Sequence, residues 1–209
     1  MENAWICVVA GGGAGRETIR AVRFAGPVGY VVTFRRTDPL YTLDLSDPAH
    51  PVVAGQLTLL GYSAYLHPLG NGLLLGVGQD ASGDGVTRGV LVSLFDVADP
   101  AHPRLLDRVT VPGSWAGTEV DPHAFAYAGG LALVPVGTGV LALRVEQNRL
   151  GTPSVLQLDR AGGLEGLDAG SIRTFVDGPT VWTVAPGPGR AVLAAHDAAS
   201  LRWLFALTF

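Results

Sequence analysis

The chain has 209 residues, of which 48% are hydrophobic and 15% charged, and its net charge is −4. This composition predicts a globular protein with a sizeable core and excludes a largely disordered chain. The acidic balance argues against a nucleic-acid partner, and the single cysteine excludes an internal disulfide. No stretch is long and apolar enough to predict a transmembrane segment.

Residues 1–14 form an atypical leader. It carries a short apolar run without a basic start, followed by several glycines, so it lacks the pattern of a signal peptide. We expect this leader to lie outside the fold, and a disordered leader is one alternative. The fold itself is expected to occupy residues 15–209.

The remainder of the chain consists of short apolar runs, each bounded by Gly, Pro or Asp. Such runs are typical of β-strands, and the 29 glycines and 14 prolines supply the turns between them. No segment combines helical periodicity with caps, so we expect almost no helix. The strands group into four units of about four strands each, at residues 21–60, 65–111, 123–159 and 172–208.

One phrase of eleven residues occurs twice. Tyr41–Pro51 and Ser93–Pro103 both end in Asp-Pro-Ala-His-Pro, and their leading aspartates, Asp44 and Asp96, are 52 residues apart (96 − 44). A repeat of this period, built from short apolar runs and turn residues, is typical of β-propeller blades. The predicted fold class is therefore all-β. We expect a partial β-propeller of about four blades, most of them four-stranded antiparallel sheets. An open arc of blades is one arrangement that such a partial propeller can take.

The repeated phrase also has a local interpretation. The aspartate before the first proline can accept a backbone hydrogen bond two residues on, which makes an Asx turn. The second proline lacks an N–H donor, so it fits the start of a strand at a sheet edge. We interpret the phrase as a connector between two strands and its histidine as a solvated turn residue. The residues concerned are Asp47, His50 and Pro51 in the first copy and Asp99, His102 and Pro103 in the second.

Several motifs follow one another along the chain in a recognisable order. They are Val22-Arg-Phe24, Gly29–Arg35, Tyr65-Leu-His-Pro68, Ser93–Val97 and Asp121-Pro-His-Ala-Phe125. In order and spacing they resemble the secreted proteins with a C-terminal β-propeller domain distantly related to WD repeats. The resemblance extends from about Gly15 to the C-terminus.

This resemblance implies partners and a cellular location for the chain, but no chemical reaction. Members of the family are longer and carry more blades upstream, so the chain is expected to be the C-terminal part of such a propeller. The implied partners are upstream propeller blades or another protein at the cell surface. The implied location is extracellular or in the cell envelope, although no signal peptide is visible in this chain.

Four polar residues fall near the starts of the predicted inner strands of the four units. In a propeller the inner strands line a central channel, so these side chains are candidates for a ligand site at the channel mouth. The arginine forks would suit a carboxylate or a phosphate. The alternative is a hydrogen-bonded structural plug. The four residues are Arg23, His67, His123 and Arg173.

A divalent metal is a second alternative for the same region. Imidazole and carboxylate groups are common metal ligands, and Asp121 lies two residues before His123, with His67 as the matching candidate of the preceding unit. The three residues His67, Asp121 and His123 therefore form the metal alternative. In the leading interpretation no cofactor is assigned.

The leading functional hypothesis is a non-enzymatic binding or interaction module, with no residue assigned as catalytic. The absence of a G-x-S-x-G nucleophile motif agrees with this hypothesis. Because the propeller architecture alone does not determine function, two alternatives stay open. One alternative is a channel-sited, metal-dependent hydrolase or lactonase-like propeller. Another is a truncated fragment without an independent function.

Overall fold

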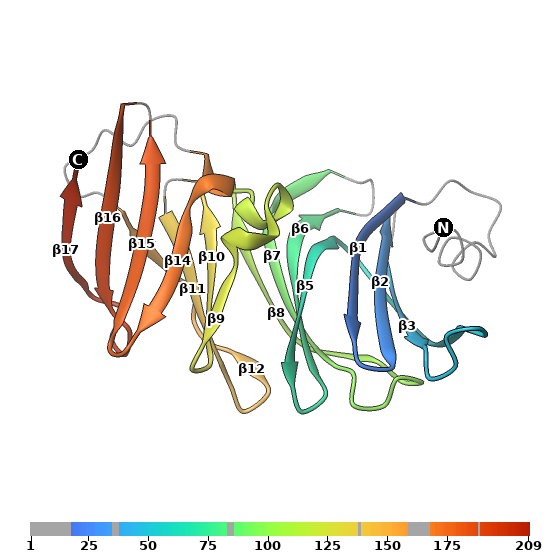
Figure 1. Cartoon of the computed structure of the whole chain (residues 1–209). Coiled ribbons are helices and arrows are strands. Elements are labelled where there is room, and N and C mark those ends of the chain that lie inside the picture. The colour runs from blue at the N-terminus through green and yellow to red at the C-terminus, as the bar shows by residue number, and fades with distance from the viewer. Residues whose placement is uncertain (1–17, 35–37, 83–85, 138, 159–167, 188) are drawn as a thin grey trace. The chain divides into compact units, whose positions relative to one another are not determined.

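The computed structural model describes residues 18–34, 38–82, 86–137, 139–158, 168–187 and 189–209, so the predicted leader lies outside the described residues (Figure 1). The chain divides into two compact units, Met1–Thr110 and Val111–Phe209. Within the described ranges, no helix is long and apolar enough to cross a membrane.

The first unit is built from two four-stranded antiparallel sheets, each with its strands in sequence order. The first sheet comprises β1 (Thr18–Ala25), β2 (Val28–Phe34), β3 (Asp38–Asp44) and β4 (Val52–Leu59). The second comprises β5 (Tyr62–Gly70), β6 (Leu73–Ala81), β7 (Thr87–Asp96) and β8 (Arg104–Pro112). Strands joined in this order form an up-and-down meander, which is the pattern of a propeller blade.

The second unit repeats this pattern with additions. Its first sheet has the order β12-β11-β10-β9, and β13 also pairs with β11; its second has the order β14-β15-β16-β17. Three 3₁₀ turns accompany the sheets: η1 (Gly117–Glu119), η2 (Pro122–Ala124) and η3 (Ala169–Ser171). The strands are β9 (Ala126–Ala128), β10 (Leu131–Val136), β11 (Gly139–Glu146), β12 (Arg149–Leu150), β13 (Ser154–Gln157), β14 (Arg173–Asp177), β15 (Thr180–Gly187), β16 (Arg190–Asp197) and β17 (Trp203–Thr208).

In each unit the core lies between the two sheets. In the first unit, apolar residues of β1, β2 and β3 pack against those of the second sheet, with members Ala21, Tyr30, Val32, Leu40, Leu66, Leu74, Phe95 and Val97. In the second unit the corresponding core includes Leu131, Leu133, Val140, Ala142, Leu156, Ile172, Val181, Val192 and Ala194. Alternate residues of each strand therefore face the neighbouring sheet, as in sheets stacked face to face.

The all-β prediction is confirmed, since the described residues form antiparallel sheets and short 3₁₀ turns. The predicted start of the third unit was wrong in one detail. His123 lies in η2 rather than at the beginning of a strand, and β9 begins at Ala126. The reason is local: the Asp121 side chain accepts a hydrogen bond from the backbone N–H of His123, and Pro122 occupies the first position of the turn, where proline is favoured.

The connector interpretation of the repeated phrase is confirmed. The carboxylates of Asp47 and Asp99 accept hydrogen bonds from the backbone N–H groups of Ala49 and Ala101, at 3.0 and 2.9 Å. The strands that follow the two connectors, β4 and β8, lie at the outer edges of their sheets. The connector histidines, His50 and His102, are solvent-exposed. The Nδ1 atom of each lies 2.8 Å from a carboxylate oxygen of the aspartate in the same connector.

Candidate functional site

The predicted site residues fall into two clusters, one in each unit. Arg23 and His67 lie in the first unit, on β1 and β5. His123 and Arg173 lie in the second, in η2 and at the start of β14. The single four-residue ligand site at a channel mouth spans both units and stays a prediction.

The first cluster centres on His67. Tyr65 and His67 are two positions apart on β5, so their side chains share a face of the strand. The Tyr65 hydroxyl lies 3.2 Å from Nδ1 of His67, and the two rings stack with centroids 6.2 Å apart. The sequence prediction assigns His67 to the site and includes Tyr65 only as part of the Tyr65–Pro68 motif; the spacing of two residues in a strand is the signal that pairs the two side chains.

The electrostatics of this cluster favour a neutral imidazole. Burial lowers the pKa of His67, and the Arg23 guanidinium lowers it further. Burial raises the pKa of Tyr65, and the Arg23 charge partly opposes that increase. The Arg23 charge that lowers the pKa of His67 also disfavours a divalent cation beside the imidazole, so the charges around His67 suit an anion better than a metal.

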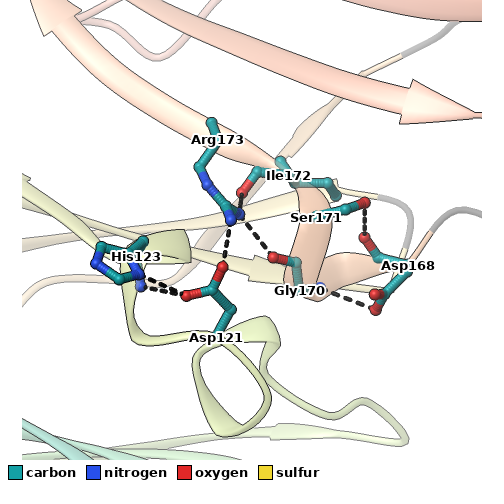
Figure 2. A network of polar contacts seen from close by, with 7 residues as sticks. All are labelled: Asp121, His123, Asp168, Gly170, Ser171, Ile172 and Arg173. Atoms are coloured by element: carbon teal, nitrogen blue, oxygen red, sulfur yellow. Dashed lines mark hydrogen bonds and ion pairs between the residues drawn. The ribbon is translucent and has the colours of Figure 1, made fainter.

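The second cluster is a network around Asp121, shown in Figure 2. One carboxylate oxygen, Oδ1, accepts hydrogen bonds from the backbone N–H of His123 at 2.9 Å and lies 2.8 Å from its Nδ1 atom. The other oxygen, Oδ2, accepts a hydrogen bond from Nη2 of Arg173. Asp121 therefore joins η2 to the start of β14 (Figure 2).

The guanidinium of Arg173 is held on several sides. Its Nη1 atom donates to the backbone carbonyls of Gly170, at 2.6 Å, and of Ile172, at 2.9 Å. The turn η3 that carries Gly170 is capped by Asp168, whose carboxylate accepts the Gly170 N–H at 3.0 Å. These bonds and the ion pair to Asp121 involve both terminal nitrogens, so the guanidinium of Arg173 helps to hold the turn in place.

Hydrogen bonding fixes the charge of Asp121. The backbone N–H of His123 has the largest effect in lowering the pKa of this carboxyl group, followed by the His123 side chain and the charge of Arg173. The carboxylate is therefore ionised at neutral pH and pairs with Arg173.

His123 itself is 85% exposed at its side chain. Its contact with Asp121 has the same 2.8 Å separation as the aspartate–histidine contacts of the two connectors. All three aspartates also accept the backbone N–H two residues on, as in an Asx turn, but His123 is two residues after its aspartate, whereas the connector histidines are three residues after theirs. Among the described residues, no serine, threonine or cysteine side chain is hydrogen-bonded to His123.

The metal alternative also spans the two units, since His67 lies in the first and Asp121 and His123 in the second. It stays a prediction. In the part of the chain that the structure describes, no group of three or more His, Cys, Asp or Glu side chains gathers so as to hold a metal ion.

Comparison with known sequences identifies the family to which the chain belongs. The family model described as "Beta propeller domain" matches residues 7–165. An uncharacterized protein of Methanocaldococcus jannaschii, MJ1554, is 37% identical over 136 residues, which are 64% of this chain and 21% of the relative. An uncharacterized protein of Archaeoglobus fulgidus is 39% identical over 123 residues, which are 58% of this chain and 19% of the relative. The chain thus spans about a fifth of the length of these relatives.

Solved structures with similar folds include the following three proteins. A europium-containing methanol dehydrogenase has a TM-score of 0.54 at 13% identity, covering 92% of this chain and 43% of that one. The dihydro-heme d1 dehydrogenase NirN in complex with DHE has a TM-score of 0.56 at 12% identity, covering 91% and 38%. AztD of Citrobacter koseri has a TM-score of 0.53 at 12% identity, covering 91% and 50%. At these identities the likeness shows the fold alone.

Proposed function

The chain belongs to the β-propeller domain family, and we propose that it serves as a non-enzymatic interaction module within a longer propeller protein. In this proposal its exposed apolar sheet faces pack against further propeller blades. Following the resemblance to secreted propeller proteins, the longer protein is located outside the cell or in the cell envelope.

The observation that carries the proposal is an apolar face on the sheet β14–β17, which we call the C-terminal face. Phe175 on β14 is 49% exposed, and Phe205 and Leu207 on β17 are 43% and 55% exposed. Phe175 is in register with Trp182, which is in register with Ala195 and so with Phe205, and side chains in register share a face. The face therefore crosses the whole sheet from β14 to β17.

The C-terminal face is the side of its sheet that points away from the core of the second unit. The alternating residues of β15 and β16, Val181, Val192 and Ala194, belong to that core. Trp182 instead meets Phe205 edge-to-face, with ring centroids 5.8 Å apart. One side of the sheet is thus packed, and the other presents aromatic and aliphatic groups to solvent.

A second apolar face occurs in the first unit, on the sheet β1–β4. Phe24 is 56% exposed, and Val22 on the same strand is exposed as well. Phe24 is in register with Gly29, then with Leu43 and then with Val53; Leu43 is buried, so the exposed apolar groups lie on the edge strands β1 and β4. The opposite side of this sheet, which includes Ala21 and Val32, belongs to the core of the unit.

Exposed apolar surface that crosses a sheet, as on the C-terminal face, is unusual on a self-sufficient soluble domain, because contiguous apolar surface favours a partner. The partner that fits a twisted, apolar β-sheet face is another sheet of the same kind, as each propeller blade packs against its neighbours. The length of the relatives, of which the chain spans about a fifth, leaves room for such blades. The engaged state of Arg173 and Asp121 supports a structural rather than a catalytic role for that cluster.

A site-specific cross-link tests the proposal. Benzoylphenylalanine replaces Phe205 in the protein expressed in its own host, and the cross-linked peptides are identified by mass spectrometry. The matched control replaces Arg149, an exposed residue of β12 in the same unit. The proposal expects cross-links from position 205 to peptides of β-propeller sequence, and few from position 149. Equal yields from both positions, or peptides without propeller sequence at position 205, would overturn it.

A further inference from the structure

A cavity of about 450 Å³ lies between the two sheets of the second unit. Its wall is made by the turns that join β9 to β10, β14 to β15 and β16 to β17, together with the side chain of Arg144 from β11. This volume falls in the range of about 300–1,000 Å³ that is typical of small-molecule sites. None of the residues singled out in the sequence lies in this wall, and we call the space the Arg144 cavity.

The cavity is left open because the turns around it are built from small residues. Gly129 and Gly178 have φ angles of +55° and +54°, in the left-handed region that favours glycine. A Cβ atom added at either position would meet no other atom within 4 Å. Ala198 and Ala199 form the wall on the side of β16 and β17, so no long side chain from these turns fills the space.

Arg144 supplies the charge of the cavity. Its Nη2 atom donates to the backbone carbonyls of Ala198, at 2.5 Å, and Ala199, at 2.9 Å, which fixes the guanidinium at the wall. A guanidinium carries five N–H donors, and within the described ranges no partner occupies those on Nη1 and Nε. No carboxylate of the described residues forms an ion pair with Arg144.

The rest of the wall is mostly apolar. Leu131, Val176 and Pro179 contribute hydrocarbon surface beside the guanidinium. A single positive charge without a counter-ion, placed beside hydrocarbon, matches a ligand with one negative charge and an apolar part. A compact, strongly hydrated dianion such as inorganic phosphate would leave the hydrocarbon wall unused.

From this arrangement we propose that the Arg144 cavity binds a small organic monocarboxylate. The carboxylate accepts hydrogen bonds from the free N–H groups of Arg144, and the hydrocarbon part lies against Leu131 and Val176. This binding site is independent of the C-terminal face and of the apolar face on the sheet β1–β4, because its wall contains none of the residues that define those faces.

The test is a titration of the purified chain with hexanoate, followed by backbone amide NMR shifts, with inorganic phosphate as a second probe. The Arg144→Met variant keeps the apolar stem and removes the charged donors, and we expect it to weaken hexanoate binding about tenfold, the effect of losing one charge-assisted contact. The Ala199→Leu variant leaves Arg144 unchanged and places a larger side chain at the wall, and it should weaken binding as well. Arg149→Met, on neighbouring β12, is the matched control and should bind as the wild type does.

Saturable hexanoate binding with shifts confined to the three turns and β11, lost in Arg144→Met and reduced in Ala199→Leu, is the expected result. Unsaturable shifts in the wild type would overturn the proposal, as would unchanged affinity in Arg144→Met. If Arg144→Met does not fold, unchanged affinity in Ala199→Leu is sufficient to reject it. Phosphate binding as strong as that of hexanoate would show an anion site without the proposed apolar selectivity, and would also reject it.

Discussion

The two units of the chain join their sheets at equivalent places but by different means. In the first unit, Thr42 of β3 donates its hydroxyl hydrogen bond to the carbonyl of Pro100, in the connector between β7 and β8. In the second, Arg144 of β11 donates to the carbonyls of Ala198 and Ala199, in the connector between β16 and β17. Each donor stands two residues before the acidic residue that ends its strand, Asp44 or Glu146.

We call the place where each connector meets the neighbouring sheet a junction. The two junctions differ in how much of the space between the sheets the connector fills. The connector of the first unit runs from 97 to 103, seven residues, and that of the second from 198 to 202, five residues. In the first unit the longer connector lies directly on Gly55 of β4, where an added Cβ would come within 2.7 Å of the Ala101 carbonyl oxygen. In the second, the outer strand β13 pairs with β11 only from Ala142 toward Gly139, away from Arg144. One junction is closed by backbone, and the other retains a cavity beside a charged side chain.

The largest expected effect comes from breaking the closed junction with Gly55→Ala. The new methyl group would overlap the backbone of Ala101 and force the connector away from β4. Overpacking of this kind costs about 3 kcal/mol in the free energy of unfolding, measured by urea denaturation. The control is Gly151→Ala near the open junction, where the nearest atom, Cβ of Arg144, lies at an ordinary 3.5 Å. Equal losses in the two variants would contradict the distinction between closed and open junctions.

The next effect concerns the hydrogen bond of the closed junction. Thr42 is fully buried, so Thr42→Val keeps its shape while leaving the Pro100 carbonyl without its donor. We expect a loss of about 1 kcal/mol in the free energy of unfolding. Arg144→Met should cost less, because Ala199 is exposed and Ala198 is only half-buried, so both carbonyls that lose a donor can turn to water. A larger loss for Arg144→Met than for Thr42→Val would reverse the comparison.

A smaller and pH-dependent effect is expected for Asp121→Asn. The amide oxygen can still accept the His123 N–H, but the ion pair to Arg173 is lost. Because folding lowers the pKa of Asp121 below its ordinary value of 3.8, the stabilisation is present above that value and is lost as pH falls through the folded pKa. The thermal midpoint of the variant should therefore lie below that of the wild type at pH 7, and the difference should shrink below about pH 4. A difference that stays constant with pH would show that charge plays no part.

The smallest effect is expected at the connector histidines. His50 and His102 are exposed, and within the described part of the chain their side chains hydrogen-bond only to the aspartates of their own turns. His50→Ala and His102→Ala should leave the denaturation midpoint unchanged within error, since exposed substitutions of this kind have little effect. A clear shift in either variant would mean that the repeated phrase does more than connect two strands.

Much of the fold could be predicted from the sequence because its signals are local. The repeated Asp-Pro-Ala-His-Pro phrase predicted both connectors, and the Asx turns at Asp47 and Asp99 form as expected. Short apolar runs bounded by turn residues gave most of the strands within a few residues. The start of β9 was misplaced because the apolar run after His123 predicts a strand from that residue, whereas Asp121 and Pro122 hold it in a 3₁₀ turn and the strand begins at Ala126.

The candidate site was less predictable because it depends on contacts between distant segments. Asp121 and Arg173 are 52 residues apart in sequence, and nothing local to either indicates the ion pair. Arg144 and Ala198 are 54 residues apart, and the cavity beside them is bounded by turns from both sheets of the second unit. Such gaps are properties of packing, which no single strand pattern encodes.

The central claim, that the C-terminal face is covered by further blades outside the cytoplasm, is tested most directly by thiol labelling of intact host cells with a membrane-impermeant maleimide. Leu207→Cys reports the face, and Arg149→Cys reports an exposed surface of the same unit, each combined with Cys7→Ser. The account predicts that Arg149→Cys is labelled and that Leu207→Cys is protected until the protein is denatured. Equal labelling of both cysteines would show an open face, and labelling of neither before lysis would contradict the proposed location.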